Sequence, residues 1–407
     1  MKICAIICEY NPFHNGHKYL LEQAKRLSGC DAVLCIMSAS FTQRGEAAIL
    51  PKFVRAEHAV LGGADCVIQL PAAFSVAPAE IFARGAISIL KSIPAVTHLA
   101  FGSEMADEEA IERAAGLFND IKADGQQNFQ ISDALARHMN AGQSYKRSLA
   151  LALEEMGAES TLVTSPNGLL AIEYTRAIKR FCADIKIIPV QRVGAGYGDS
   201  SLKENFSSAS AIRANLGDNA VESNVPGYVL KTLKNTDAAG AKERFDCLLR
   251  YALCTADRRD MQRIFGCTEG LENKLKNCVD MSAGGIIDAA TGKRYTSSRI
   301  RRVLTANMLG IYSDEVKRYI DEGTYIKPLA VCEDKKEEIF AELAKSPLPV
   351  IIKKMSLSAL GHTDKRINSS AQTPAFKCYK TDIRADFARS LIYGGQPEYE
   401  YTVKIVP

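Results

Sequence analysis

Two histidines three residues apart, His14 and His17, are the side chains of this sequence best suited to chemistry. They lie in residues 9–17, which read Glu-Tyr-Asn-Pro-Phe-His-Asn-Gly-His. An imidazole can donate hydrogen bonds to phosphate oxygens whether it is neutral or protonated. Such donors favour a reaction in which negative charge builds on an α-phosphate and on departing pyrophosphate. The pair therefore predicts a site that reacts with a nucleoside triphosphate.

The pattern around the histidines indicates where such a site would lie. The apolar run Ile3–Cys8 is typical of a buried parallel strand, and residues 16–27 have helical periodicity. In doubly wound sheets, ligands bind in the crevice at the carboxyl ends of the strands. A helix that begins there offers free backbone N–H groups to phosphates, and Gly16 lets the backbone approach them. A metal site or a surface histidine pair is the alternative. No cluster of further ligands is visible in the sequence, so no metal site is predicted.

Strand and helix patterns alternate through the first half of the chain. Strands are predicted at residues 3–8, 32–37, 66–70, 97–101 and 185–190, with helices at residues 16–27, 52–62 and 79–93 between them. This alternation predicts an α/β fold with a doubly wound parallel sheet, that is, a Rossmann-like, nucleotidyltransferase-like core followed by a mostly helical C-terminal region.

Chain length and changes of pattern predict three parts. The 407 residues exceed the size of one ordinary domain. Residues 1–215 are predicted to form the nucleotide-binding catalytic domain, with a helical insertion at about 105–182. Residues 216–325 are helical by pattern. Residues 326–407 are predicted to form a small α/β segment, with a strand-helix-strand unit at residues 326–331, 335–344 and 349–353.

A second polar motif lies at residues 206–213, which read Phe-Ser-Ser-Ala-Ser-Ala-Ile-Arg. It places hydroxyl groups at the start of a predicted helix and Arg213 one turn later. Ser207 or Ser208 can serve simply as the helix N-cap, the usual role of such serines. The two motifs together resemble the His-x-Gly-His nucleotidyltransferases, in which an Ile-Ser-Ser-x-x-Ile-Arg-like segment binds the β- and γ-phosphates. The resemblance implies that the catalytic residues are His14, His17, Ser208 and Arg213.

The resemblance extends to a narrower family. Arg192 and residues 8–17, 37–46, 64–71, 101–104, 165–174, 206–213 and 293–302 are similar to the bacterial tRNA(Met) cytidine acetate ligase family. These stretches span nearly the whole chain. One departure follows residues 43–46, Gln-Arg-Gly-Glu, where Ala47 and Ala48 stand in place of the expected Pro-Ala. The missing proline removes no chemical group.

The resemblance implies an acyl-adenylate-forming ligase. Acetate would attack the α-phosphate of ATP to give acetyl-adenylate and pyrophosphate, and the acetyl group would pass to N4 of the wobble cytidine of elongator tRNA(Met). Mg²⁺ is the expected counter-ion of ATP, although the sequence shows no dedicated carboxylate cage. The ATP contacts implied by the resemblance are Ile7, Cys8, Glu9, Tyr10, Asn11, Pro12, Phe13, His14, Asn15, Gly16, His17, Lys18, Tyr19, Leu20, Gly102, Asn167 and Arg192.

Three of these residues have physical roles that can be stated from their surroundings. Gly102 follows the fourth strand, where a Cβ atom would crowd a nucleotide. Asn167 begins a predicted helix and can bond a ribose or purine edge, or cap the helix instead. Arg192 follows the fifth strand and can clamp a phosphate, or form a surface salt bridge.

The acyl chemistry needs groups beyond the histidines. A carboxylate is already a nucleophile, so the histidines act electrostatically, whereas the cytidine amine must lose a proton. The candidates for the base that takes it are Asp65, Glu104 and His58. The sequence leaves all three open. The loop that contains Gln43, Arg44 and Glu46 is expected to hold the acetate.

The densest basic cluster of the chain lies in residues 293–302. It consists of Lys293, Arg294, Tyr295, Arg299, Arg301 and Arg302. Cations of this kind bind RNA phosphates, and Tyr295 can stack on an unpaired base. A solvated helix face is the alternative for such a run. With the family resemblance, the cluster predicts a tRNA-binding domain at residues 216–325.

Composition sets limits on the function class. Lys and Arg total 51 against 47 Asp and Glu, a net charge of +4 that is too small to indicate a nucleic-acid binder by itself. The 12 cysteines form no Cys-x-x-Cys pair, and Cys35, Cys66, Cys182 and Cys254 lie in apolar stretches. Buried reduced thiols are therefore predicted. No apolar run approaches the ~20 residues of a membrane helix, and no leader precedes the first strand. A cytoplasmic protein without membrane contact is expected.

Two other functions remain compatible with the sequence. A nucleotidyltransferase acting on a small phosphate substrate would need only residues 1–215 and would leave the helical half unused. A nucleotide-binding or RNA-binding protein without turnover would not need both histidines and the serine-arginine motif. The ligase uses all of these features and is the leading prediction.

Overall fold

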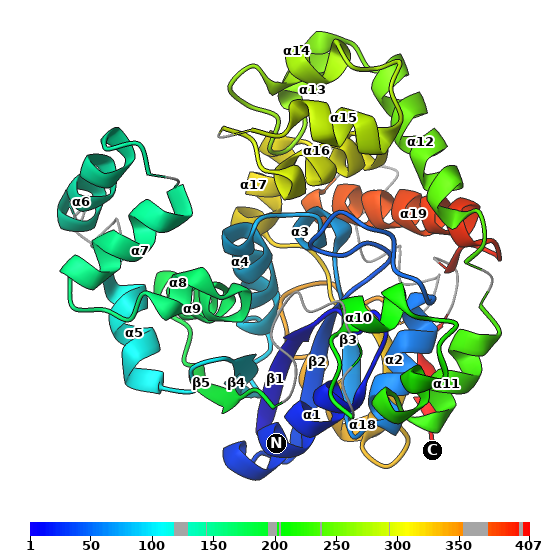
Figure 1. Cartoon of the computed structure of the whole chain (residues 1–407). Coiled ribbons are helices and arrows are strands. Elements are labelled where there is room, and N and C mark those ends of the chain that lie inside the picture. The colour runs from blue at the N-terminus through cyan, green and yellow to red at the C-terminus, as the bar shows by residue number, and fades with distance from the viewer. Residues whose placement is uncertain are drawn as a thin grey trace, which may run out of the picture.

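A computed structural model of the chain confirms the predicted α/β class (Figure 1). It describes residues 1–117, 129–143, 145–193, 202, 205–236, 238–292, 294–352, 373–398 and 402–407. The strands among them are β1 (Ile3–Cys8), β2 (Ala32–Ser38), β3 (Cys66–Leu70), β4 (Val96–Ser103), β5 (Lys186–Gln191), β6 (Pro328–Cys332) and β7 (Lys404–Val406). They form one sheet in the order β5-β4-β1-β2-β3-β6-β7. The five strands expected from the alternating pattern are all present and mutually parallel.

The strand order reverses around β1, which fixes the position of the site. β1 pairs with β2 on one side, with Ile6 opposite Cys35, and with β4 on the other, with Ile6 opposite Ala100. The chain leaves β1 at its carboxyl end and enters the histidine motif directly. A reversal of this kind opens a crevice outside the carboxyl ends of the strands, where ligands bind in open α/β sheets.

Both faces of β1 are buried because successive side chains of a strand point to opposite sides. The odd-numbered residues of β1 face a core shared with α4 (Ala79–Leu90) and α9 (Pro166–Arg180). The even-numbered residues face a core shared with α1 (Asn15–Ser28) and α2 (Lys52–Leu61). Helices on both faces explain why the strand reads as a continuous apolar run instead of an alternating one.

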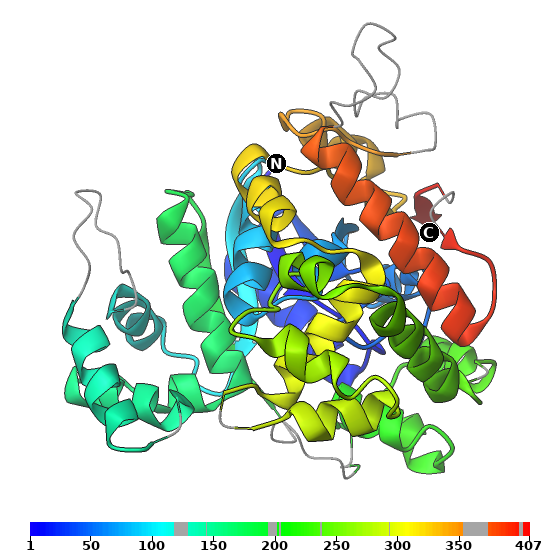
Figure 2. The ribbon, with the colours of Figure 1, turned by 90° about the horizontal axis from the view of Figure 1, so that it is seen from above.

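The remaining helices form two groups beside and above the sheet. The predicted insertion contains α5 (Glu108–Leu117), α6 (Phe129–Asn140), α7 (Tyr145–Glu155) and α8 (Thr161–Thr164). The helical group, as we call the second set, contains α12 (Ala241–Thr255), α13 (Arg258–Arg263), α14 (Leu271–Lys276), α15 (Ala283–Ala290), α16 (Ser297–Leu309) and α17 (Ser313–Glu322). Figure 1 shows the helical group above the carboxyl edge of the sheet, and Figure 2 shows the insertion set apart from it.

Shorter elements complete the described chain. They are α3 (Ala72–Ser75), α10 (Ala209–Ala214), the 3-10 helix η1 (Asn219–Asn224), α11 (Gly227–Lys234), α18 (Lys336–Leu343) and the long C-terminal helix α19 (Pro374–Tyr393). In Figure 1, α19 lies between the helical group and the sheet. None of the described helices is long and apolar enough to cross a membrane.

The C-terminal stretch differs from the predicted strand-helix-strand unit. Its first strand and its helix are present as β6 and α18. The expected strand at residues 349–353 ends at Lys353, which lies outside the described residues, and it is wrong for residues 349–352, since Val350 forms only an isolated bridge with Ile326. Pro349 has no N–H to donate to a ladder, which disfavours a regular strand there. β7 pairs with β6 instead, and β6 is antiparallel to β3, so this stretch extends the same sheet as residues 1–215.

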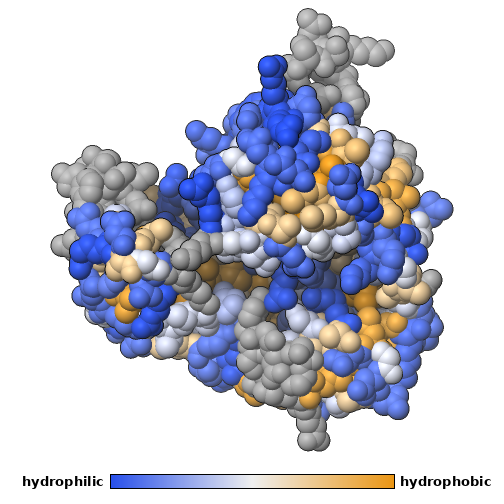
Figure 3. Space-filling view, turned by 45° about the horizontal axis from the view of Figure 1, so that its top comes forward, coloured by the Kyte–Doolittle hydropathy of each residue, from blue (hydrophilic) through white to orange (hydrophobic). Residues whose placement is uncertain are grey.

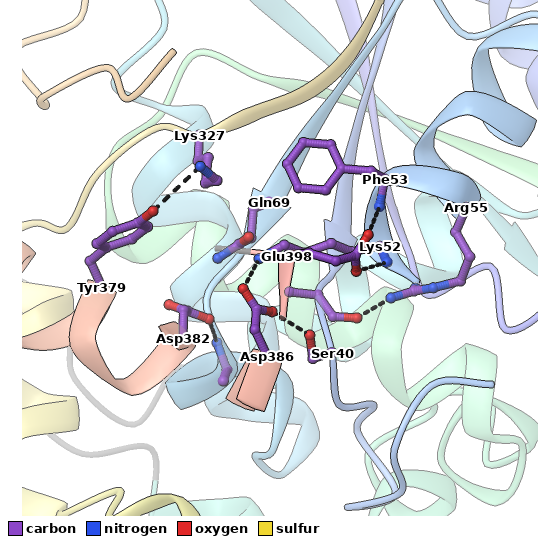
Figure 4. Close-up of polar contacts among 12 residues, drawn as sticks. Ser40, Lys52, Phe53, Arg55, Gln69, Lys327, Tyr379, Asp382, Asp386 and Glu398 are labelled. Carbon is purple, nitrogen blue, oxygen red and sulfur yellow. Dashed lines mark hydrogen bonds and ion pairs between the residues drawn. The ribbon is translucent and has the colours of Figure 1, made fainter. Parts of the chain in front are cut away.

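A buried polar network joins α19 to the sheet domain (Figure 4). The Lys52 ammonium lies 2.6 Å from a carboxylate oxygen of Asp386, and both side chains are almost completely buried. Ser40 donates to the other oxygen of Asp386 at 2.5 Å. Asp382 accepts from the Tyr325 hydroxyl at 2.5 Å and from the backbone N–H of Ala72. The network fixes the C-terminal helix against the loop that follows β2.

The cysteine prediction is confirmed in part. All 12 thiols are free, and Cys35 and Cys66 are buried in the sheet. Cys182 and Cys254 are exposed, however, so the expectation of burial was wrong for them. Both lie at helix ends, where an apolar neighbourhood in the sequence does not require a position in the core.

Candidate active site

A cleft of about 270 Å³ opens at the carboxyl ends of β1, β4 and β5 and brings the two sequence motifs together. The predicted residues that line it are Ile7, Cys8, Glu9, Tyr10, Asn11, His14, Gly16, His17, Tyr19, Leu20, Gly102, Asn167, Arg192, Ser208 and Arg213. The loop after β2 adds Thr42, Gln43 and Arg44. Residues from six separate parts of the chain therefore meet at the edge that the sheet topology selects.

Four predicted ATP contacts do not line this cleft. Pro12 and Phe13 are buried, and Phe13 packs so closely on Gly62 that an added Cβ atom there would meet its ring. Asn15 donates to the backbone oxygens of Asn205 and Ser223 at 3.2 and 2.8 Å. The Lys18 side chain is exposed on α1. The first three residues therefore hold the turn in shape, and their contact with ATP stays a prediction.

His14 and His17 fix each other's geometry at the start of α1. The Nδ1 atom of His14 accepts from the N–H of Gly16 at 3.1 Å, and the N–H of His14 donates to Nδ1 of His17 at 3.3 Å. The two rings stack with centroids 3.6 Å apart. Because each Nδ1 accepts a hydrogen bond, each neutral ring carries its hydrogen on Nε2. The pair thus presents two N–H donors whose positions are fixed by these contacts.

Both imidazoles are neutral at physiological pH. Burial, with a smaller contribution from the nearby Arg192 cation, lowers the pKa of His14 to about 3. Burial lowers the pKa of His17 as well, and His14 and Arg192 add to the effect. A neutral donor stabilises developing negative charge without itself having to lose a proton. This agrees with the electrostatic role expected of the pair.

The turn between β1 and α1 is held in an unusual conformation. Tyr10 has a φ of 48°, in the left-handed region that residues with a Cβ atom rarely adopt. Its ring contacts that of His17 with centroids 4.7 Å apart, and its hydroxyl lies 3.3 Å from the Cys35 sulfur. Asn11 accepts from the N–H of Ile49 at 2.9 Å. Such strain persists only where surrounding contacts determine it, as at ligand sites.

Gly102, Asn167 and Arg192 lie together at the β4–β5 side of the cleft. A Cβ atom at Gly102 would lie 3.4 Å from the Arg192 side chain, so the glycine leaves room for that arginine. Asn167 donates to Glu104 at 2.6 Å and does not cap α9, because Ser165 accepts from Gly168 and is the N-cap. The capping alternative for Asn167 is therefore wrong.

Ser208 and Arg213 lie on α10 across the cleft from these residues. Ser208 caps α10 by accepting from the N–H of Ala211 at 3.1 Å, while it also lines the cleft. One Arg213 nitrogen donates to the backbone oxygen of Asn11 at 2.7 Å, and another lies 3.4 Å from Glu46. The arginine thereby connects the second motif to the histidine turn, and its charge faces the cleft.

Aromatic and aliphatic residues of the cleft escaped the sequence prediction. Phe101, Leu170 and Tyr174 form part of its wall. Asn167, Leu170 and Tyr174 are three and four residues apart on α9 and share one face of that helix. This spacing within residues 165–174 was the signal that could have found them. An apolar wall opposite polar groups is typical of a pocket for a small organic molecule such as a nucleotide.

Two of the three candidate bases lie away from the cleft. Asp65 accepts from the N–H of Val33 at 2.7 Å and pairs with Lys335, at the amino ends of the strands. His58 lies on α2 and contacts Thr232 of α11 at 3.1 Å. Glu104 is nearer, but one of its oxygens is bonded to Asn167, and the other is buried without a hydrogen-bond partner among the described residues. None of the three lines the cleft.

The basic cluster is largely engaged within the protein. Lys293 lies outside the described residues, and Arg294 is exposed. Tyr295 is only 7% exposed and donates to the Glu269 backbone at 2.5 Å, so the prediction that it stacks on an RNA base is wrong. The Arg299 guanidinium lies over its ring, 5.3 Å from the ring centroid.

The three arginines of α16 also have partners or are partly buried. Arg299 bonds to Glu269 and Thr268, and Arg301 donates to Glu46 at 3.1 Å. Burial and the Arg299 charge lower the pKa of Arg302 to about 10. Their role in RNA binding stays a prediction.

Comparisons with known proteins agree with this geometry. A family model described as HIGH Nucleotidyl Transferase matches residues 1–401. The tRNA(Met) cytidine acetate ligase of Anoxybacillus flavithermus is 36% identical over 345 residues, which cover 82% of this chain and 84% of that protein. That of Caldanaerobacter subterraneus subsp. tengcongensis is 35% identical over 366 residues, 87% of this chain and 89% of that protein.

Solved structures show the same fold. The crystal structure of Thermotoga maritima TmcAL in its apo form has a TM-score of 0.87 and 26% identity, and it covers 100% of both chains. A second structure of that protein, bound with alpha-thio ATP, has a TM-score of 0.84 with the same identity and coverage. Sequence and structure together show that the chain belongs to the tRNA(Met) cytidine acetate ligase family of HIGH nucleotidyl transferases.

Proposed function

We propose that this enzyme forms acetyl-adenylate from acetate and ATP and transfers the acetyl group to N4 of the wobble cytidine of elongator tRNA(Met). The observation that carries the proposal is the cleft that unites His14 and His17 with Ser208 and Arg213. Relatives named tRNA(Met) cytidine acetate ligase support the overall reaction, and the neighbour bound with alpha-thio ATP supports ATP as the ligand of the cleft.

The first step is attack of an acetate oxygen on the α-phosphorus of ATP. A new P–O bond forms to acetate, the P–O bond to pyrophosphate breaks, and pyrophosphate leaves. The neutral rings of His14 and His17 would donate from Nε2 to phosphate oxygens as charge builds. Arg192 and Arg213, which face the cleft from opposite sides, would neutralise the phosphates.

Mg²⁺ belongs in this scheme to the substrate, as the Mg²⁺ complex of ATP. The residues that the structure describes contain no group of three or more His, Cys, Asp or Glu side chains placed to hold a metal ion. Phosphate oxygens and water are the ligands that Mg²⁺ commonly keeps in such sites.

The acetate end of the cleft would lie at the loop after β2, as the sequence predicted. Gln43 lines the cleft, and its side-chain Nε2 is buried without a hydrogen-bond partner among the described residues. A buried donor without a partner costs roughly 1–3 kcal/mol, so such a group calls for a ligand atom. An acetate or acetyl oxygen would satisfy it.

The tRNA would approach from the helical group. Arg294 is exposed there, and Arg301 and Thr305 of α16 contact Glu46 and Gly45 of the loop that lines the cleft. Figure 3 shows this face of the molecule hollowed near its centre, with both hydrophilic and hydrophobic side chains around the hollow. A wobble base turned out of the anticodon loop would enter there to reach the acetyl group.

The proposal is tested by ATP–pyrophosphate exchange with and without acetate, in the absence of RNA. Exchange that requires acetate, followed by transfer of labelled acetate to tRNA(Met) transcript, is the expected result. Exchange with a small phosphate acceptor in place of acetate would make the enzyme an ordinary nucleotidyltransferase. Nucleotide binding without exchange under any condition would contradict both the ligase function and the nucleotidyltransferase function.

A further inference from the structure

We propose that Glu9 is the catalytic base that takes the proton from the acceptor amine during acetyl transfer. The inference rests on the proposed function, which requires that an amine lose a proton but does not say to which group. It follows from the position of Glu9 in the cleft, from the hydrogen bond that orients its carboxylate, and from the absence of another acidic side chain among the described residues that line the cleft.

Glu9 is the acidic side chain of the cleft. Among the described residues that line it, no other Asp or Glu occurs. The two histidines cannot accept the proton, because each already uses Nδ1 as an acceptor and carries its hydrogen on Nε2. A base must come within hydrogen-bond reach of the proton it removes, so the carboxylates outside the cleft are excluded by position.

The carboxylate of Glu9 is held in one orientation. Its Oε1 atom accepts from the backbone N–H of Gln43 at 2.6 Å. No hydrogen bond to its Oε2 atom is found within the described part of the chain, so this oxygen is free to receive a proton. The backbone oxygen of Glu9 accepts from the buried guanidinium of Arg55 at 2.6 Å, which anchors the residue from below.

Gln43 links this base to the acyl group. Its backbone orients Glu9, and its side-chain Nε2 is the unpartnered donor assigned above to the acetyl oxygen. The carbonyl carbon under attack would then lie between a donor for its oxygen and an acceptor for the attacking amine. Such an arrangement of donor and base about one reacting atom is what acyl transfer to an amine requires.

The electrostatic surroundings make Glu9 a stronger base than a surface carboxylate. Burial raises its pKa, against the opposing effects of the Gln43 N–H and the nearby Arg213, Arg44 and Arg55 cations. A carboxyl group that holds a proton more readily is better able to take one from a nitrogen that becomes positively charged.

The neutral N4 amine attacks the carbonyl carbon of acetyl-adenylate, a C–N bond forms, and the carbonyl electron pair moves to oxygen. The nitrogen gives one proton to Oε2 of Glu9. The intermediate collapses, the C–O bond to the phosphate breaks, and AMP leaves as an anion that needs no proton. Glu9 then releases its proton to solvent.

The test supplies chemically made acetyl-adenylate to Glu9→Gln and follows acetyl transfer to tRNA(Met) in a single turnover across pH. In the wild type, the rate should rise with pH as Glu9 loses its proton and then level off. In Glu9→Gln, it should fall about 10²- to 10⁴-fold and lose this rise, and Glu9→Asp should restore part of both. Glu173→Gln is the matched control, a buried carboxyl with a raised pKa that does not line the cleft.

A second readout separates the steps. Hydroxylamine is a strong nucleophile that needs no enzyme base, so its reaction with the adenylate reports the first step alone. A transfer rate in Glu9→Gln within about 3-fold of the wild type, with the same pH profile, would overturn the assignment. Failure of the wild type to use supplied acetyl-adenylate would instead contradict the proposed function. Should Glu9→Gln not fold, as judged by thermal melting, Glu9→Asp and the wild-type pH profile decide.

Discussion

Arg301 of α16 donates to Glu46 at 3.1 Å, and this ion pair joins the helical group to the catalytic domain beside the cleft. The other oxygen of Glu46 lies 3.4 Å from Arg213, which lines the cleft. One carboxylate therefore lies between an arginine of the predicted RNA-binding helix and an arginine of the second motif. Gly45, next to it, has a φ of 72° and packs against the backbone of Arg301 and Arg302.

We expect Arg301→Ala to weaken the use of ATP even without RNA. Without the Arg301 side chain, Glu46 pairs with Arg213 alone. Glu46 then draws the Arg213 charge away from the phosphates of ATP. The KM for ATP in acetate-dependent pyrophosphate exchange should rise roughly 3- to 30-fold, as for loss of one charged contact. Arg318→Ala, which removes an exposed pair with Glu322 on α17, is the control. An Arg301→Ala enzyme with unchanged exchange and weaker tRNA binding would place Arg301 on the RNA surface.

We expect His17→Ala to reduce exchange by about 10²- to 10³-fold, the usual loss on removing one donor to a developing oxyanion. Since burial lowers the pKa of His14 to about 3 and that of His17 well below its usual range, the exchange rate should show no step at the ordinary histidine pKa of 6.5. His17→Gln, which retains an N–H donor, should recover part of the rate. A wild-type exchange rate that halves near pH 6.5 and loses this step in His17→Gln would show a charged imidazole instead.

We expect Gln43→Leu to raise the KM for acetate about 10-fold or more while changing the KM for ATP much less. The substitution removes the unpartnered Nε2 donor but keeps the backbone N–H that orients Glu9. Loss of one hydrogen bond to a charged group costs roughly 1.5–3 kcal/mol. Steady-state exchange at varied acetate and fixed ATP measures it. Equal rises in both constants would indicate a general disturbance of the loop.

The protein should lose stability as pH falls below about 6.5. Burial lowers the pKa of His58 to about 4, whereas the unfolded chain takes up the proton near the ordinary value of 6.5. The stabilisation is therefore present above pH 6.5 and is lost between 6.5 and 4. Urea unfolding at pH 7.5 and 5 should show a smaller loss in His58→Phe, by about 1–3 kcal/mol at most. Identical losses in the two proteins would contradict the assignment.

Lys52→Met should destabilise the fold by about 3–5 kcal/mol, because it leaves Asp386 buried without its counter-charge. The double variant Lys52→Met with Asp386→Leu should regain much of this loss, since replacing both partners of a buried pair is often tolerated. Urea unfolding of the three proteins measures the difference. A single variant as stable as the wild type would show that water or Lys327 compensates the charge.

The sequence predicted those parts of the fold that depend on local pattern. The apolar run of β1, the histidine turn and the helix after it are adjacent in the chain. The local sequence pattern therefore predicts this strand-turn-helix unit. His14, His17, Ser208 and Arg213 were found because two motifs with fixed spacing carry them, whereas Asn167 and Arg192 came from the family resemblance. Tyr174 was missed although helical spacing linked it to Asn167.

The rest depends on contacts between distant segments. Nothing in residues 293–302 indicates that Tyr295 is covered by the chain around Glu269, or that Arg301 meets Glu46. β6 and β3 pair antiparallel although more than half of the chain separates them in the sequence. No alternating pattern in the sequence indicates this pairing. The assignment of a base likewise required the fold, because the three carboxylate and histidine candidates look equivalent until their surroundings are known.

The attachment of α19 to the loop after β2 has a consequence for synthesis on the ribosome. Arg389 donates to the backbone oxygens of Ala48 and Ile49 at 2.9 and 2.8 Å, and Glu398 accepts from the backbone N–H of Lys52 at 2.8 Å. The loop that carries Gln43 can therefore make these contacts only after residues some 340 positions later have been translated. A nascent chain holds its histidine motif early, whereas the loop after β2 can gain these contacts only near the end of translation.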